Sequence, residues 1–177
     1  FEPFHLVNQR KNYSKLLSSV PFLCASIIPS LLYAAYLAFI TQASFLYTET
    51  YQLSLLQYVF HQGCVIFTFS MMSLFSGRAI QVLGARTSII TGMSISTMSA
   101  LLMSLSGLIN PTSSYLVTFY MSLVGLGSAI TYPVIFAGSL DIFPEIKGTA
   151  SSTVMSMRAL ICFLIVGLSS YAYNGNP

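Results

Sequence analysis

The feature that most constrains this sequence is the length of its stretches without a charged residue. Four such stretches run for 33, 28, 54 and 19 residues: between Lys15 and Glu49, between Glu49 and Arg78, between Arg86 and Asp141, and after Arg158. A helix needs about 20 mostly apolar residues to cross the hydrocarbon core of a bilayer. The stretches predict five membrane-spanning helices: the first two hold one each, the third is long enough for two, and the last contains part of a fifth that must begin before Arg158.

The composition supports lipid as the surrounding medium. Charged residues make up 6% of the chain, against about 25% in a typical soluble domain, and 55% of the chain is hydrophobic. The composition excludes two other classes of protein: a disordered chain is poor in apolar residues, and a secreted disulfide scaffold is rich in cysteine. The three cysteines lie inside apolar runs, where we interpret them as small apolar residues. The net charge of +3 gives no indication of nucleic-acid binding.

The predicted fold is an all-α integral membrane bundle. Alternation with a period of two, expected for barrel strands, is not seen, and lipid-exposed backbone must satisfy its own hydrogen bonds. The two helices of the third stretch separate at the turn cluster of residues 107–114. We expect a cytoplasmic segment at 1–15, a bundle over 16–173 and a truncated tail at 174–177. The predicted spans are Leu16–Ile40, Leu53–Phe75, Thr87–Leu108, Tyr115–Ala137 and Thr149–Tyr171.

Basic residues predict the orientation of the bundle. They occur before the first span and in the second and fourth connections, which lie on one side of the membrane when five spans alternate. The positive-inside rule makes that side cytoplasmic, so the N-terminus is expected inside the cell. The basic residues concerned are Arg10, Lys11, Lys15, Arg78, Arg86 and Lys147.

Small residues recur every four positions in the third span, and proline interrupts the first and fourth. The recurrence predicts one face along which helix backbones approach closely. The prolines are consistent with two interpretations: helices that bend during function, or the ordinary tolerance of proline in membrane helices. They are Pro21, Pro29 and Pro133. The small residues are Ser88, Gly92, Ser96, Ala100 and Ser104.

Arg158 is the strongest candidate for a functional residue. The apolar run after it, 159–173, is too short to span alone, so the helix must begin near residue 148. Arg158 then lies roughly 15 Å along the helix axis, near mid-membrane. An ionisable side chain at that depth is costly and indicates function. It could bind an anionic substrate group or pair with an acid outside this chain; the alternative is a guanidinium that reaches back to the headgroups.

The other candidates for a substrate or ion pathway are a histidine, its neighbour and several tyrosines. His61, which has Gln62 beside it, could handle protons because histidine titrates near neutral pH; the alternative is a packed or headgroup-facing side chain. Tyr33, Tyr36 and Tyr132 could line an aromatic cavity or belong to interfacial belts. No metal-ligand spacing, phosphate-binding loop or catalytic constellation was found, so we expect no cofactor, no metal and no enzyme.

The second connection resembles the loop signature of the major facilitator superfamily. That signature has a glycine, an acidic residue four positions later, a second glycine seven positions after the first, and then basic residues. Gly77, Gly84 and Arg86 match it. Gln81 stands at the acidic position and Ala85 at one basic position, which is the degenerate form found in the second half of such transporters.

The fourth connection resembles that of the drug:proton antiporters of the bicyclomycin-resistance type. These carry a proline and then Gly-x-Ala-Ser at the start of the next helix, and that helix can carry a basic residue where Arg158 stands. The matching residues here are Pro144, Gly148, Ala150 and Ser151.

The resemblance implies a place and a function for the chain. It maps the five spans onto helices seven to eleven of a twelve-helix transporter in the inner membrane, with the N-terminal half missing. It also implies proton-coupled, antiporter-type efflux of small amphipathic molecules or drugs by alternating access. The expected partners are the substrate, protons, the lipid bilayer and the missing half, and no nucleic acid.

The sequence is also consistent with functions other than transport. The main alternative is a non-transporting membrane scaffold or truncated gene product. A membrane enzyme would need paired catalytic groups, and the only close acids, Asp141 and Glu145, have the character of loop charges. A half-transporter that dimerises conflicts with the odd number of spans.

Overall fold

The computed structural model describes residues 6–109 and 113–172, and over these ranges the chain is helical, without a strand. Five helices are long and apolar enough to cross a membrane, as predicted. The predicted tail and the Asn110–Thr112 centre of the predicted break lie outside the described residues. The elements are α1 (Leu6–Leu17), α2 (Val20–Phe45), a π-helical turn η1 (Leu46–Thr50), α3 (Leu55–Leu83), α4 (Ala85–Ile109), α5 (Ser114–Asp141), a 3₁₀ turn η2 (Pro144–Ile146) and α6 (Lys147–Ala172).

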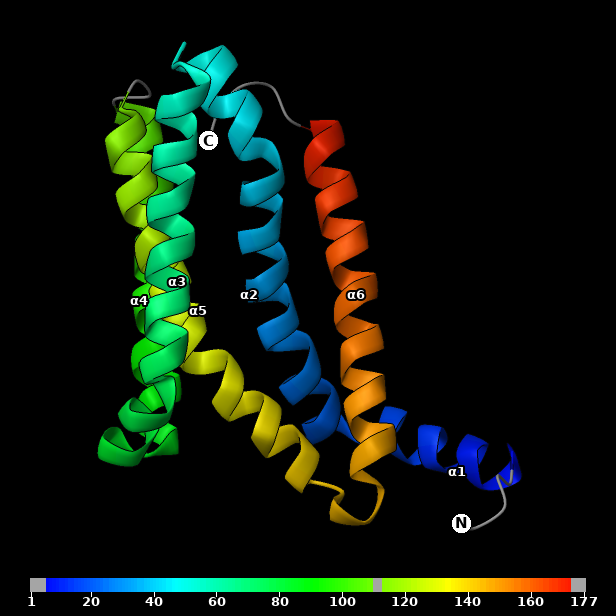
Figure 1. Cartoon of the computed structure of the whole chain (residues 1–177). Helices are drawn as coiled ribbons and strands as arrows, with labels where there is room; N and C mark the ends of the chain where they lie inside the picture. Colours follow the sequence, from blue (N-terminus) through cyan, green and yellow to red (C-terminus); the bar gives the residue numbers. More distant parts are fainter. Residues whose placement is uncertain (1–5, 110–112, 173–177) are drawn as a thin grey trace.

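The helix α5 is the centre of the bundle. It packs most extensively against α4 and α3, and then against α2, whereas α6 packs mainly on α2. Figure 1 shows why: α5 begins beside α3 and α4, and its C-terminal part runs across to the base of α2 and α6. Residues of α2, α3, α5 and α6 are thereby brought to one place in the bundle.

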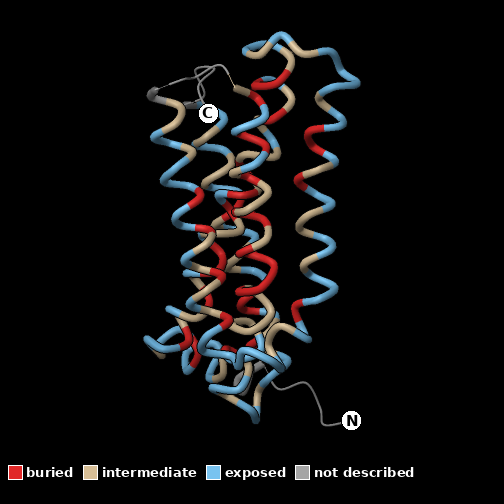
Figure 2. The backbone as a smooth tube through the Cα atoms, turned by 90° about the vertical axis from the view of Figure 1, so that its left-hand side faces the viewer, coloured by how far each residue is buried: buried red, intermediate tan, exposed pale blue. Residues whose placement is uncertain are grey.

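The outward faces of the helices are apolar. Large hydrophobic side chains such as Leu56, Phe60, Leu74 and Phe163 are more than two-thirds exposed. Figure 2 shows that the buried positions run along the inner helices, while the outward-facing positions are exposed. A soluble protein would not present such faces to water, and a bilayer is the solvent that suits them.

The first long helix begins at Val20 rather than at Leu16. Ser19 has extended backbone angles, and its Oγ accepts a hydrogen bond from the Phe22 amide at 3.5 Å. Pro21 lies in the first turn, where its missing N–H costs nothing. Pro21 therefore marks a helix start, and only Pro29 lies inside this helix.

The backbones of α4 and α5 approach each other closely at two glycines. A Cβ atom built on Gly92 would stand 2.6 Å from the Gly127 carbonyl oxygen, and one built on Gly127 would stand 3.0 Å from the Ser96 amide nitrogen. The Ser96 hydroxyl donates to the Val124 carbonyl across the same contact at 3.2 Å. Small residues thus allow the contact, as they do in membrane helix pairs generally.

The predicted small-residue face of α4 is correct only in its first half. Ser88 and Ser96 are buried, but Ala100 and Ser104 are exposed and Ser99 is buried instead. Each step of four residues turns an α-helix by about 400°, so the row drifts about 40° per step. After four steps it has moved to nearly the opposite side of the helix.

The connection between α3 and α4 is a single glycine. Gly84 has φ 80° and ψ 157°, a combination that only glycine adopts readily, and its amide donates to the Ile80 carbonyl at 2.9 Å. Gly77 and the residues after it belong to the last turns of α3, so the segment expected as a loop is mostly helix.

Candidate functional site

Arg158 lies half-buried in a cavity between four helices. The residue follows the start of α6 by three turns, and its neighbours come from α2, α3 and α5. The cavity has a volume of about 170 Å³. It is lined by Pro29, Leu32, Tyr33, Phe69, Ser128, Thr131, Tyr132 and Arg158.

Two tyrosines hold the guanidinium group of Arg158. Its central carbon lies 5.1 Å from the ring centroid of Tyr33 and 5.1 Å from that of Tyr132. The Tyr132 hydroxyl accepts a hydrogen bond from Arg158 Nη1, and Met155 Sδ lies 3.1 Å from Nη2. A cation over aromatic faces is stabilised by the ring quadrupoles, and most strongly away from water. The tyrosines therefore fix the orientation of the charge without neutralising it.

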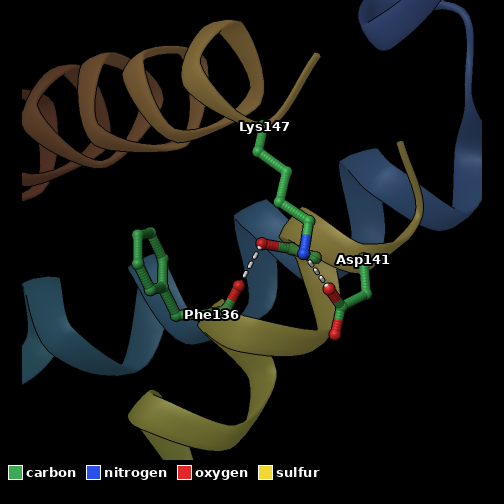
Figure 3. A network of polar contacts seen from close by, with 4 residues as sticks. Phe136, Asp141 and Lys147 are labelled. Atoms are coloured by element: carbon green, nitrogen blue, oxygen red, sulfur yellow. Dashed lines mark hydrogen bonds and ion pairs between the residues drawn. The ribbon is translucent and has the colours of Figure 1, made fainter. Parts of the chain in front are cut away.

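No carboxylate lines this cavity. Among residues 6–109 and 113–172 the ion pairs are Lys15 Nζ with Glu145 Oε1 at 2.6 Å and Lys147 Nζ with Asp141 Oδ1 at 2.7 Å. Figure 3 shows the second pair, which joins the start of α6 to the end of α5. Arg158 is thus a cation without an acidic partner in the described part of the chain.

The two ion pairs join the ends of elements at the surface. All four side chains are more than half exposed, so each pair contributes little to stability. The hydrogen bond from Lys15 holds the pKa of the Glu145 carboxyl below its usual range. These acids therefore have the character of ordinary charges at helix ends.

Ser128 adds an unused polar group to the cavity. The residue is 6% exposed, and its Oγ has no hydrogen-bond partner among the described residues. Buried hydroxyl groups are normally hydrogen-bonded, so an orphaned one facing a cavity indicates room for a ligand atom or a water molecule.

His61 lies in a different cluster. Its Nδ1 is 2.8 Å from Thr118 Oγ1, and its ring lies between Tyr47, at 5.1 Å, and Tyr115, at 5.0 Å between centroids. The residue is 5% exposed and borders a second cavity of about 270 Å³ together with Gln57 and Tyr115.

The hydrogen bonds around Thr118 assign the proton on His61. The Thr118 hydroxyl donates to the Ser114 carbonyl at 2.9 Å, so its lone pairs accept from the Tyr47 hydroxyl and from His61 Nδ1. Neutral His61 therefore carries its hydrogen on Nδ1 and has Nε2 as a proton acceptor.

The remaining candidates lie outside the Arg158 cavity. Tyr36 is buried and stacks on Phe69, with ring centroids 5.5 Å apart, so it packs against a residue that lines the cavity without lining it itself. Gln62 is 9% exposed, and its Oε1 has no hydrogen-bond partner among the described residues. The structure thus brings three of the predicted residues together, Arg158, Tyr33 and Tyr132, and places the others elsewhere.

The residues of the two resemblance motifs lie at helix ends. Gly84 and Arg86 lie at the junction of α3 and α4, and Pro144 opens η2 just before Gly148 in α6. Figure 1 places both junctions at the same end of the bundle as α1. Only Gly84 has a backbone conformation that requires glycine; Gly77 and Gly148 have open space where a Cβ would lie.

Sequence reasoning missed two parts of the site. Ser128 and Thr131 carry no charge and were not singled out, although Ser128 precedes Tyr132 by four residues and so shares its helix face. The Thr118 hydroxyl at the centre of the His61 cluster was also missed, because the partners are 57 residues apart and no local spacing indicates the contact.

Comparison with models of protein families shows which family the chain is similar to. The family model described as Major Facilitator Superfamily covers residues 2–166 of the chain. The comparison with curated proteins gave no match, and neither did the comparison with solved structures.

Proposed function

This chain belongs to the Major Facilitator Superfamily of membrane transporters, and from that premise we propose that it forms the C-terminal half of a secondary active transporter. Its five spans would correspond to helices seven to eleven, and a second bundle would provide the opposite wall of a site near the bilayer midplane. Rocking of the two bundles against each other would expose that site to each side in turn.

The observation that carries this proposal is the cavity around Arg158. A guanidinium group without an acidic partner is costly at membrane depth, and a scaffold has no need for it. In a transporter the same group can bind substrate. Pro29 lines this cavity and Pro133 follows Tyr132, so both prolines that interrupt a helix lie beside the site, where a bend would change its shape.

The finer assignment rests on the two sequence motifs. Their likeness to drug:proton antiporters supports efflux of small amphipathic molecules driven by inward proton flow. His61 is our candidate for a proton-binding group, because its Nδ1–H donates to Thr118, which leaves Nε2 of the neutral ring as the proton acceptor, and the residue borders the second cavity. The basic end of the bundle, which carries α1, would face the cytoplasm of a cell with this protein in its inner membrane.

Gradient-driven flux in proteoliposomes tests the proposal. We expect the complete transporter to move amphipathic compounds when a proton gradient is imposed and to stop when a protonophore collapses it. Arg158→Gln should abolish this flux, whereas Arg10→Gln should not, because Arg10 is exposed on α1. Flux that Arg158→Gln leaves unchanged would refute the role of the cavity, and the absence of flux for every compound would favour a scaffold.

A further inference from the structure

We propose that the Arg158 cavity selects small organic anions, with one oxyanion group and one aromatic or compact apolar body. This inference rests on the proposed function, since it assigns a substrate class to the proposed transport site. It depends on the donors, the volume and the charge of the cavity, which are independent observations.

The donors of the cavity match an oxyanion. A guanidinium has five N–H donors in a planar fork, and protein atoms use only part of this set: Tyr132 accepts one hydrogen bond and the weak acceptor Met155 lies against another nitrogen. The Tyr132 hydroxyl still has its own hydrogen to donate. Ser128 supplies a further buried hydroxyl, which has no hydrogen-bond partner within residues 6–109 and 113–172. A carboxylate has enough lone pairs to accept from donors of all three kinds, and its hydrogen bonds to a guanidinium are charge-assisted, whereas those of a neutral group gain less.

The remaining wall matches an aromatic or compact apolar body. The other lining residues include Leu32, Tyr33 and Phe69, so the cavity offers ring and aliphatic surface in addition to the donors. A cavity of about 150 Å³ is known to hold one benzene molecule, and this cavity measures about 170 Å³. It is therefore suited to a single ring with one small polar substituent rather than to a large lipid-like molecule.

The charge of the cavity disfavours cations. A bound cation would lie close to the Arg158 guanidinium, and no Asp or Glu lines the cavity to offset the repulsion. The described acids are at the ends of the helices, and two of them are already paired with lysines. At low effective dielectric, repulsion between like charges is large, so the sign of the ligand charge decides binding.

Three ligands of one shape and different charge test the inference. Benzoate, benzamide and benzamidine share a ring and a planar substituent but carry charges of −1, 0 and +1. Their equilibrium binding to the complete, purified transporter would be measured by calorimetry in nanodiscs of phosphatidylcholine. We expect benzoate to bind at least tenfold more tightly than benzamide, with benzamidine the weakest. Equal binding, a preference for benzamidine, or no benzoate binding would overturn the inference.

Variants identify the group responsible. Arg158→Gln should weaken benzoate binding about 10- to 100-fold, the range expected when charge-assisted hydrogen bonds are lost, and should leave benzamide binding nearly unchanged. Ser128→Ala should weaken benzoate binding several-fold in a protein that keeps its fold, and Arg10→Gln should change neither ligand. Circular dichroism would verify the fold of each variant. Unchanged benzoate affinity in both cavity variants would overturn the inference.

Two further arms separate the remaining explanations. Nanodiscs that contain phosphatidylglycerol test whether a lipid headgroup is the anion; displacement of benzoate by that lipid would overturn the inference. Flux measurements separate it from the proposed function. Transport of cations in preference to benzoate would support the transport proposal and overturn the inference about anions. Benzoate binding as predicted, without transport of any compound, would overturn the transport proposal.

Discussion

At the scale of single residues, Thr118 holds the His61 cluster together. Its hydroxyl is the common partner of His61, Tyr47 and the Ser114 carbonyl, and it is almost fully buried. A buried donor that loses its acceptor costs about 1–3 kcal/mol. The orientation of two large rings therefore depends on one small side chain.

Replacing Thr118 by Val should destabilise the protein by about 2–6 kcal/mol, because the shape stays the same and two buried donors lose their acceptor at about 1–3 kcal/mol each. Thr118→Ser keeps the hydroxyl and should cost far less. Unfolding in mixed detergent measures both variants against the parent protein. Equal stability of the Val and Ser variants would show that the hydrogen bonds around Thr118 contribute little.

Arg158 shows which features of the candidate site can be predicted from the sequence at this scale. A lone charge in an apolar run is visible without a structure, and it indicated Arg158, which the structure places at a cavity. Its orientation depends on Tyr33 and Tyr132, which come from two other helices. Spacing within one helix says nothing about these distances, so the sequence could not distinguish the tyrosines that line the cavity from Tyr36, which packs on Phe69.

At the scale of elements, the contact between α4 and α5 depends on the absence of side chains at Gly92 and Gly127. The sequence indicated a face of small residues, because glycine and serine stand out in an apolar helix. It could not indicate where the face ends, since that depends on how the row drifts around the helix and where α5 crosses it. The exposed Ala100 and Ser104 mark that limit.

Gly127→Ala should force α4 and α5 apart and destabilise the protein by about 1–3 kcal/mol, the usual cost of overpacking. The added methyl group would meet the Gly92 carbonyl oxygen and the Ser96 side chain. Gly138→Ala is the matched control in the same helix, because nothing lies within 4 Å of its Cβ position. Thermal unfolding in detergent should separate the two, and a Gly127→Ala protein as stable as the control would contradict the close approach.

At the scale of the whole molecule, the long uncharged stretches were sufficient to predict five membrane-spanning helices. Their lengths fix the number of helices, since lipid allows only helices or closed barrels. The ends of the helices follow local signals that length does not reveal. Ser19 and Pro21 delay the first long helix, and α3 continues through Gly77 until Gly84 turns the chain.

The central claim is that the Arg158 cavity opens to each side of the membrane in turn. Ser128→Cys places a thiol of nearly the same size in the cavity, in a protein whose Cys24, Cys64 and Cys162 have been replaced. Membrane-impermeant thiol reagents would be applied to one face at a time, in inside-out and right-side-out vesicles. The account predicts labelling from both faces and protection by benzoate. Labelling from one face only, whatever the gradient or ligand, would contradict it.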